Sequence, residues 1–154
     1  MSKQHIPALY QEKKLELKEE LKATEHVAIT MDSWTSNQNK EYLGITAHYF
    51  RVPDYKLQSK VLSNDDLNDD PTGENIGNAL LAVLTEWEIM DKISAVVTDG
   101  AAVNGAAVRH IGLKDKHAYC VGHKLNLVVK DSIADYEPVV GKVRRIANFF
   151  HHSP

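Results

Sequence analysis

Two aspartates follow two apolar, β-branched segments of the chain. Asp32 ends the run from His26 to Met31, and Asp99 ends the run from Ile93 to Thr98. Such runs are typical of buried strands, and the carboxyl ends of parallel strands meet at the edge of a sheet where ligands bind. Two carboxylates at one edge suit a hard cation such as Mg²⁺, which supports phosphodiester chemistry. We therefore predict that Asp32 and Asp99 share a metal; the alternative is that each only caps the segment after it.

Cys120 and His123 form a second group of residues that could bind a metal or react, and His117 lies three residues before the cysteine. Structural zinc normally needs four ligands, and no second pair stands elsewhere in the sequence, so zinc is not expected. A nucleophilic cysteine is not expected either, because neither an orienting group nor an oxyanion site can be identified. Hydrogen bonding at the start of a helix is the simpler role for Cys120 and His123.

Trp34 and three basic residues near the end of the chain are candidates for contact with nucleic acid. Trp34 is expected on a loop, where it could stack on an extruded base; the equal alternative is a core tryptophan folded over the sheet edge. Lys142, Arg144 and Arg145 are expected on the exposed side of the last helix. They could contact phosphate, although such a face is usually only solvated.

The hydrophobic periodicity predicts the elements that position these residues. In chain order they are a helix over 8–24, strands over 26–31, 42–50 and 56–63, an acidic loop over 64–71, a helix over 74–87 capped by Thr72, a strand over 93–98, a short helix over 106–111, an extended segment over 117–120, and helices over 124–133 and 139–150. A right-handed crossover through helix 74–87 lays strand 93–98 parallel to strand 26–31. The predicted fold is α/β, a mixed five-stranded sheet with helices on both faces.

The composition bounds the class of protein. The chain has 154 residues, 43% of them hydrophobic and 25% charged, which fits one globular domain. The net charge of -3 shows no overall basic character for nucleic-acid binding. The single cysteine excludes an internal disulfide, and neither a signal peptide nor a membrane span is expected. A reducing intracellular compartment is the default expectation.

Six ordered segments resemble hAT transposases, and most closely the BED-type zinc-finger proteins domesticated from them. The segments are Thr30–Ser36 with its Asp-Ser-Trp-Thr, Tyr42–His48, Thr72–Ile76, Trp87–Ile93, Thr98–Asp99, and Cys120–Leu127 with its Cys-Val-Gly-His. The resemblance extends from about Leu9 to Pro154 and includes the stretch Arg144–Ser153. It implies a ribonuclease-H-like catalytic core, with a lead-in helix over 1–25, the first part of the core over 26–135, and a helix over 136–154 that leads into an insertion domain.

The resemblance also implies roles for particular residues. Asp32 and Asp99 match the first two members of a catalytic Asp-Asp-Glu triad that uses Mg²⁺ or Mn²⁺ on DNA, and the Cys120/His123 pair matches a recurring element near that active site. The third member, a glutamate, is expected beyond this chain, so the chain is not expected to cleave DNA by itself. A nuclear location, no membrane partner, and homo-oligomers formed through other regions are also implied. The rival hypothesis is a domesticated DNA-binding or transcription-regulatory protein that keeps the fold as a non-catalytic scaffold.

One departure from the family pattern concerns the residues after Asp99. Relatives commonly have Asp-Asn-Ala-x-Asn, whereas this chain has Gly100 and places its asparagine one position later, at Asn104. Altered side-chain hydrogen bonds beside the metal are therefore expected, which favours a copy no longer under catalytic selection. The last helix is further expected to expose Val139, Val143, Ile146 and Phe150 and so to promote self-association.

Overall fold

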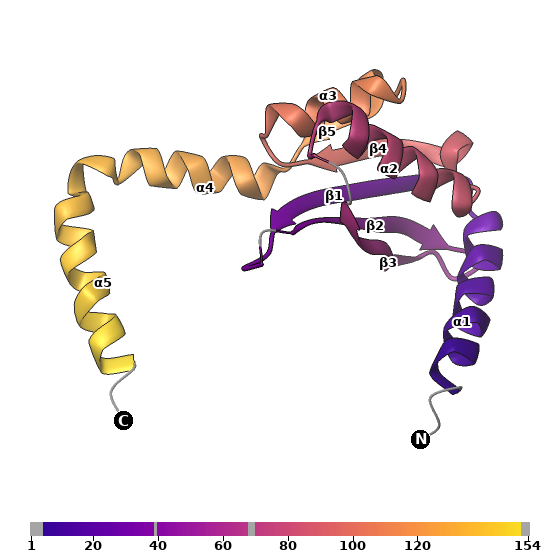
Figure 1. Ribbon diagram of the computed structural model, residues 1–154, viewed down its shortest axis with the longest axis horizontal. Coiled ribbons are helices and arrows are strands. Elements are labelled where there is room, and N and C mark those ends of the chain that lie inside the picture. The colour runs from indigo at the N-terminus through magenta and orange to yellow at the C-terminus, as the bar shows by residue number, and fades with distance from the viewer. Residues whose placement is uncertain (1–4, 39, 68–69, 152–154) are drawn as a thin grey trace. The chain divides into compact units, whose positions relative to one another are not determined.

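A computed structural model describes residues 5–38, 40–67 and 70–151, with side chains from residue 6 onward. The chain divides into two compact units, Met1–Cys120 and Val121–Pro154. The first unit contains α1 (His5–Lys22), β1 (Val27–Thr35), β2 (Glu41–Arg51), β3 (Lys56–Leu67), α2 (Gly73–Glu86), β4 (Ile93–Thr98), α3 (Ala102–His110) and β5 (His117–Tyr119), with short 3₁₀ turns at Met90–Lys92 and Lys114–Lys116 (Figure 1). None of the described helices is long and apolar enough to cross a bilayer.

The five strands form one mixed sheet in the order β3-β2-β1-β4-β5. β1, β2 and β3 make the expected antiparallel meander, whereas β4 pairs parallel to β1 and β5 pairs parallel to β4. The chain leaves β3 at one edge of the meander and passes through α2 before it enters β4, which lies beside β1. This connection is the crossover that the sequence predicts. The mixed five-stranded, ribonuclease-H-like fold is thereby confirmed.

The core lies between the sheet and the helices of this unit. Alternate residues of β1 and β2 point into it, among them Ile29 and Ile45, both fully buried. α2 contributes Ile76, Leu80 and Leu84, which are also fully buried and recur at helical spacing. Thr72 caps α2 as predicted, since its hydroxyl accepts a hydrogen bond from the Asn75 N–H at 3.2 Å.

α2 and α3 pack closely because α2 has glycine where α3 approaches. A Cβ atom built on Gly77 would lie 2.9 Å from the carbonyl oxygen of Ala107, and one built on Gly73 would lie 2.6 Å from the Ala106 Cβ. Any side chain at these two positions would force the helices apart. The two glycines therefore set the position of α3, which begins directly beyond the carboxyl end of β4.

The strands run further than the sequence pattern predicts. β1 continues through Thr35, so Asp32 lies within the strand and Trp34 is not on a loop. β3 continues to Leu67, so the expected acidic loop is wrong over 64–67; positions 68–69 lie outside the described residues. Pairing explains both differences, because Asp32–Thr35 bond to Glu41–Gly44, which in turn bond to Asn64–Leu67. Cross-strand hydrogen bonds hold polar residues in strands that their own composition does not favour.

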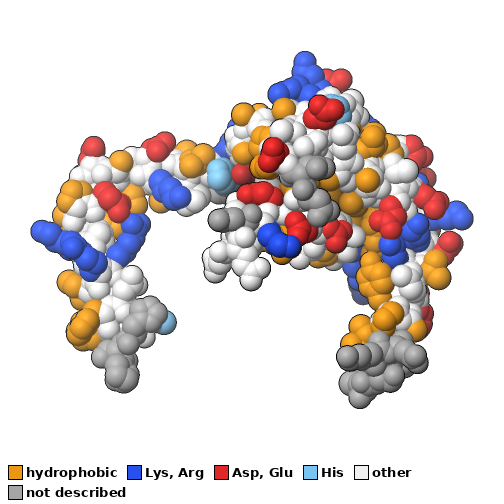
Figure 2. Space-filling view, in the orientation of Figure 1, with side chains coloured by type: hydrophobic (Ala, Val, Ile, Leu, Met, Phe, Trp, Pro, Cys, Tyr) orange, Lys and Arg blue, Asp and Glu red, His pale blue; other side chains and the backbone are white. Residues whose placement is uncertain are grey.

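The second unit consists of α4 (Val121–Ser132), a 3₁₀ turn at Ala134–Tyr136, and α5 (Glu137–His151). Pro138 lies in the first turn of α5, where a proline costs no backbone hydrogen bond. Neither helix buries a residue in the described structure. The expected exposure along α5 is confirmed: Val139, Val143, Ile146 and Phe150 are 61%, 60%, 59% and 71% exposed. Figure 2 shows these helices carrying hydrophobic side chains beside groups of Lys and Arg.

Candidate metal and nucleic-acid site

The parallel pairing of β1 with β4 brings the two aspartates together. Thr30 pairs with Val97 in that ladder. Asp32 lies two residues beyond Thr30, and Asp99 lies two residues beyond Val97. Carried forward by two residues, the same register would set Asp32 next to Asp99, which follows the carboxyl end of β4. Asp32 lies inside β1 rather than after it, and the shared metal at Asp32 and Asp99 stays a prediction.

The surroundings of Asp32 leave its carboxylate open. Asp32 is exposed, and its antiparallel partner is Gly44, which has no side chain to cover it. Among the described residues, no side chain forms a hydrogen bond or an ion pair with Asp32. Two carboxylates with open oxygens are the ligand set that a Mg²⁺ ion takes from a protein when it keeps its remaining positions for water and phosphate. The residues present fit such an ion.

Asp99 is held more firmly. Its Oδ1 accepts hydrogen bonds from the Ala101 N–H at 2.9 Å and from the Asn104 side-chain amide at 2.8 Å. Asp99 therefore does close the turn into α3, as the capping alternative requires, but only through Oδ1. Oδ2 has no hydrogen-bond partner among the described residues. Capping and metal binding are compatible at this residue.

Trp34 lies on the same face as Asp32, two residues further along β1. It stacks against Tyr42 of β2, with ring centroids 5.8 Å apart and an interplanar angle of 14°. The indole also lies over Gly44, where an added Cβ would come within 3.1 Å of it. Trp34 remains 41% exposed. It is therefore neither a loop residue nor a buried core residue, but part of an aromatic shelf beside Asp32.

The outer strand next to Asp99 is tied to β4 by a histidine. His117 Nε2 lies 2.9 Å from the Thr98 hydroxyl, and that hydroxyl also donates to the Asp99 carbonyl oxygen at 3.0 Å. His117 also packs edge-on against Tyr119, with centroids 4.8 Å apart. His117 thus has a structural role beside the site, and a search of the described residues finds no group of three or more His, Cys, Asp or Glu that could hold a metal.

The remaining candidates fall outside this sheet face or in the second unit. Cys120 is a free thiol at the end of β5, with its N–H bonded to the Thr98 carbonyl at 2.7 Å, and His123 lies in α4. Lys142, Arg144 and Arg145 are exposed on α5. Arg144 already donates to Glu137 at 2.8 Å, which leaves Lys142 and Arg145 as the more available cations of the three.

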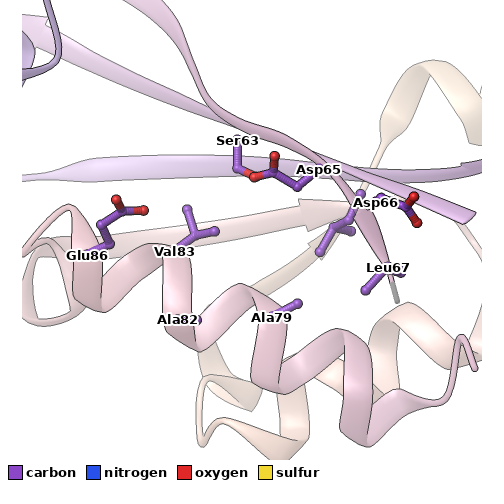
Figure 3. A pocket seen from close by; sticks show the side chains of 9 residues that line it. Ser63, Asp65, Asp66, Leu67, Ala79, Ala82, Val83 and Glu86 are labelled. Atoms are coloured by element: carbon purple, nitrogen blue, oxygen red, sulfur yellow. The ribbon is translucent and has the colours of Figure 1, made fainter. Parts of the chain in front are cut away.

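A pocket of about 290 Å³ lies between the end of β3 and α2, away from the two aspartates (Figure 3). Asp65, Asp66 and Glu86 line it, yet each has a partner. Ser63 donates to Asp65 at 2.6 Å, and Lys40 pairs with Asp66 at 2.9 Å. Lys14 pairs with Glu86. Because Asp66 and Glu86 are each paired with the positive charge of a lysine, this pocket is a weaker candidate for a cation than Asp32 and Asp99.

Sequence reasoning missed two parts of the site, the Tyr42 ring and the Asn104 bond to Asp99. Strand alternation could have found the first, since Tyr42 and Gly44 have the parity that faces Trp34 and Asp32 once β1 is extended. No local pattern could have found the second. Asn104, in the first turn of α3, donates its side-chain amide to Asp99.

Comparison with known proteins finds a matching family model and several similar proteins. A family model described as the ZBED1 RNase-like domain matches residues 30–136. "Putative AC transposase" of Zea mays is 31% identical over 99% of this chain and 21% of its own length. "Zinc finger BED domain-containing protein 4" of Homo sapiens is 28% identical over 99% of this chain and 14% of its own length. "Putative transcriptional regulator tpeD" of Talaromyces stipitatus is 26% identical over 86% of this chain and 17% of its own length.

This chain spans about a fifth of the maize relatives that it matches. Among solved structures, the HTLV-2 integrase catalytic core domain in complex with magnesium is similar over 77% of this chain and 76% of that chain. The sequence identity is 13% and the TM-score 0.30, a likeness too weak to carry an argument.

Proposed function

This chain belongs to the family of the ZBED1 RNase-like domain, which is the hAT and BED-type lineage that its motifs resemble, and from that premise we propose that it is the first part of a metal-dependent DNA transposase core. The observation that supports the proposal is the parallel pairing of β1 with β4, whose last pair, Thr30 with Val97, lies two residues before each aspartate. Within the described part of the chain, both carboxylates keep an oxygen without a hydrogen-bond partner. The intact protein would use them in DNA strand cleavage and transfer.

Each residue of the site has a distinct task in this proposal. Asp32 and Asp99 would hold Mg²⁺ or Mn²⁺, and the bound ion would supply Lewis-acid activation for phosphodiester chemistry. Trp34 and Tyr42 offer a flat apolar surface on which a base beside the scissile phosphate can stack. In the second unit, and as a separate proposal, Lys142, Arg144 and Arg145 on α5 are candidates for phosphate contacts. Because the proposed substrate is DNA, we place the protein in the nucleus.

Two carboxylates alone do not complete a two-metal site, and the described residues contain no third acidic or imidazole ligand near them. The proposal therefore assigns DNA cleavage to the full-length protein and metal binding to this chain. The chain by itself is expected to bind Mn²⁺ weakly and to leave supercoiled plasmid DNA uncut.

Mn²⁺ titration followed by amide NMR tests the metal site. Paramagnetic broadening should appear first around Asp32 and Asp99 and should be lost in Asp32→Asn and Asp99→Asn. Asp115→Asn is the matched control, because Asp115 is exposed on the 3₁₀ turn before β5. Broadening that is centred elsewhere, or that survives both site substitutions, would refute the proposal.

Oligonucleotide binding tests the aromatic shelf. The two tryptophans differ sharply in exposure, Trp34 at 41% and Trp87 at 5%, so single-stranded DNA should quench only the Trp34 fluorescence. Stacking on an aromatic side chain is worth about 1–3 kcal/mol per base, and Trp34→Ala should weaken binding by that amount. Equal affinity of the wild type and Trp34→Ala would remove Trp34 from the site.

A non-catalytic scaffold is the second candidate function. Its specific support is a relative whose name is a putative transcriptional regulator. Under this alternative the folded chain binds DNA or a protein partner and does not bind Mn²⁺ at Asp32 and Asp99. The same titration separates the two functions.

A further inference from the structure

A buried asparagine stands directly behind Asp99. Asn104 is 1% exposed, and its side-chain amide donates to Asp99 Oδ1 at 2.8 Å. The other end of the same side chain, Oδ1, is buried without any hydrogen-bond partner. A carbonyl oxygen left unpaired in the interior costs stability. The Asn104 side chain therefore orients Asp99, while its unpaired oxygen lowers the stability of the fold.

The backbone around Asn104 shows how its side chain reaches Asp99. α3 begins at Ala102, and Asn104 is the third residue of the helix. The residue before the helix, Ala101, offers no side-chain cap, so Asp99 takes that place by accepting the Ala101 N–H. The Asn104 amide approaches the same oxygen from inside the helix. Asp99 Oδ1 thus has two donors, which fix the plane of the carboxylate.

The helix that carries Asn104 is itself fixed in place. Its buried face includes Ala107 and Val108. The Ala107 carbonyl oxygen lies so close to Gly77 of α2 that a Cβ atom added to this glycine would be 2.9 Å from it. Asn104 cannot move without moving this packed helix. A rigid donor on a rigid helix holds the Asp99 carboxylate in one orientation, which leaves Oδ2 as the oxygen free for a ligand.

From these contacts we infer that Asn104 is a positioning residue for the metal site, orienting Asp99 so that Oδ2 faces the cation shared with Asp32. The inference rests on the proposed function and adds a residue that touches neither metal nor substrate. Groups that orient a metal ligand typically contribute about 10- to 100-fold in metal affinity.

Asn104→Leu is the sharpest test, because leucine has a similar volume and removes both the donor and the unpaired oxygen. The expected melting temperature, measured without metal, is unchanged or higher, since the unsatisfied buried oxygen is gone. The Mn²⁺ affinity, measured by EPR of free Mn²⁺ in the 154-residue chain, should fall by about tenfold or more.

Val108→Ala is the matched control on the same buried face of α3. It creates a cavity and should lower the melting temperature, but it leaves the Asp99 contacts intact and should keep the Mn²⁺ affinity of the wild type. A side chain with a purely structural role would give the opposite result in Asn104→Leu, a loss of stability without a loss of affinity.

The outcomes separate this inference from the proposed function. Wild-type protein that binds Mn²⁺ through Asp32 and Asp99, with Asn104→Leu binding equally well, overturns only the role of Asn104. Equal affinity losses in Asn104→Leu and Val108→Ala also overturn it, because the effect would then come from general loosening of α3. Wild-type protein that binds no Mn²⁺ at these aspartates overturns the proposed function, and this inference falls with it.

Discussion

Gly77→Ala probes the contact that sets the position of α3. In an open helix this substitution stabilises by about 1 kcal/mol, because alanine has the higher helix propensity. At Gly77 the new Cβ would lie 2.9 Å from the Ala107 carbonyl oxygen and 3.0 Å from the His110 ring. The nearest neighbour is backbone, so it cannot rotate away, and overpacking of this kind costs about 1–3 kcal/mol. Together, the two effects should lower the free energy of unfolding by about 1 kcal/mol, and by at most about 2 kcal/mol.

Urea unfolding followed by circular dichroism measures this difference. Ala82→Gly on the exposed side of α2 is the control, since it reports helix propensity without a packing change and should cost about 1 kcal/mol. If Gly77→Ala instead stabilises the protein by about the propensity difference, the space between α2 and α3 is wider than described, and the rigid seating of α3 is refuted.

Three further outcomes are expected. Trp87→Phe should lower the free energy of unfolding by about 1–2 kcal/mol in a urea titration, because a buried carbonyl would lose its donor. In the wild type the indole N–H donates to the Leu62 carbonyl at 3.2 Å, at the register shift of β3. An unchanged free energy of unfolding would contradict this expectation. Arg51 holds the pKa of the Asp54 carboxyl below its ordinary value through their hydrogen bond. Because the folded-state pKa is the lower one, the stabilisation is present above the unfolded-state pKa and is lost as the pH falls through the folded-state pKa; carbon NMR should show the Asp54 pKa rising in Arg51→Ala, and no rise would exclude the ion pair in solution. Sedimentation should show self-association that Val143→Glu, in the exposed stripe of α5, reduces; a wild-type monomer at all concentrations would contradict it.

Much of the fold follows from local patterns. The apolar run before Asp99 predicts β4 with the bounds that the structure has, and Thr72 predicts the start of α2. The sequence pattern predicts the ends of β1 and β3 less well, because both strands continue into polar residues that are held in strand conformation by hydrogen bonds to the neighbouring strand. Asp32 and Trp34 lie in β1 only because β2 bonds to them. A residue's own preference carries no information about that partner.

The order of the strands and helices, the family of the chain and the choice of the two aspartates as candidate ligands follow from residue types and their spacing along the chain. The stacking of Tyr42 on Trp34, the close approach of α3 to Gly77 and the bond from Asn104 to Asp99 Oδ1 are visible only in the folded chain. Each of these contacts joins elements that are brought together by packing of the core. Their distances are set by the backbone positions of two elements at once, which no single segment of sequence specifies.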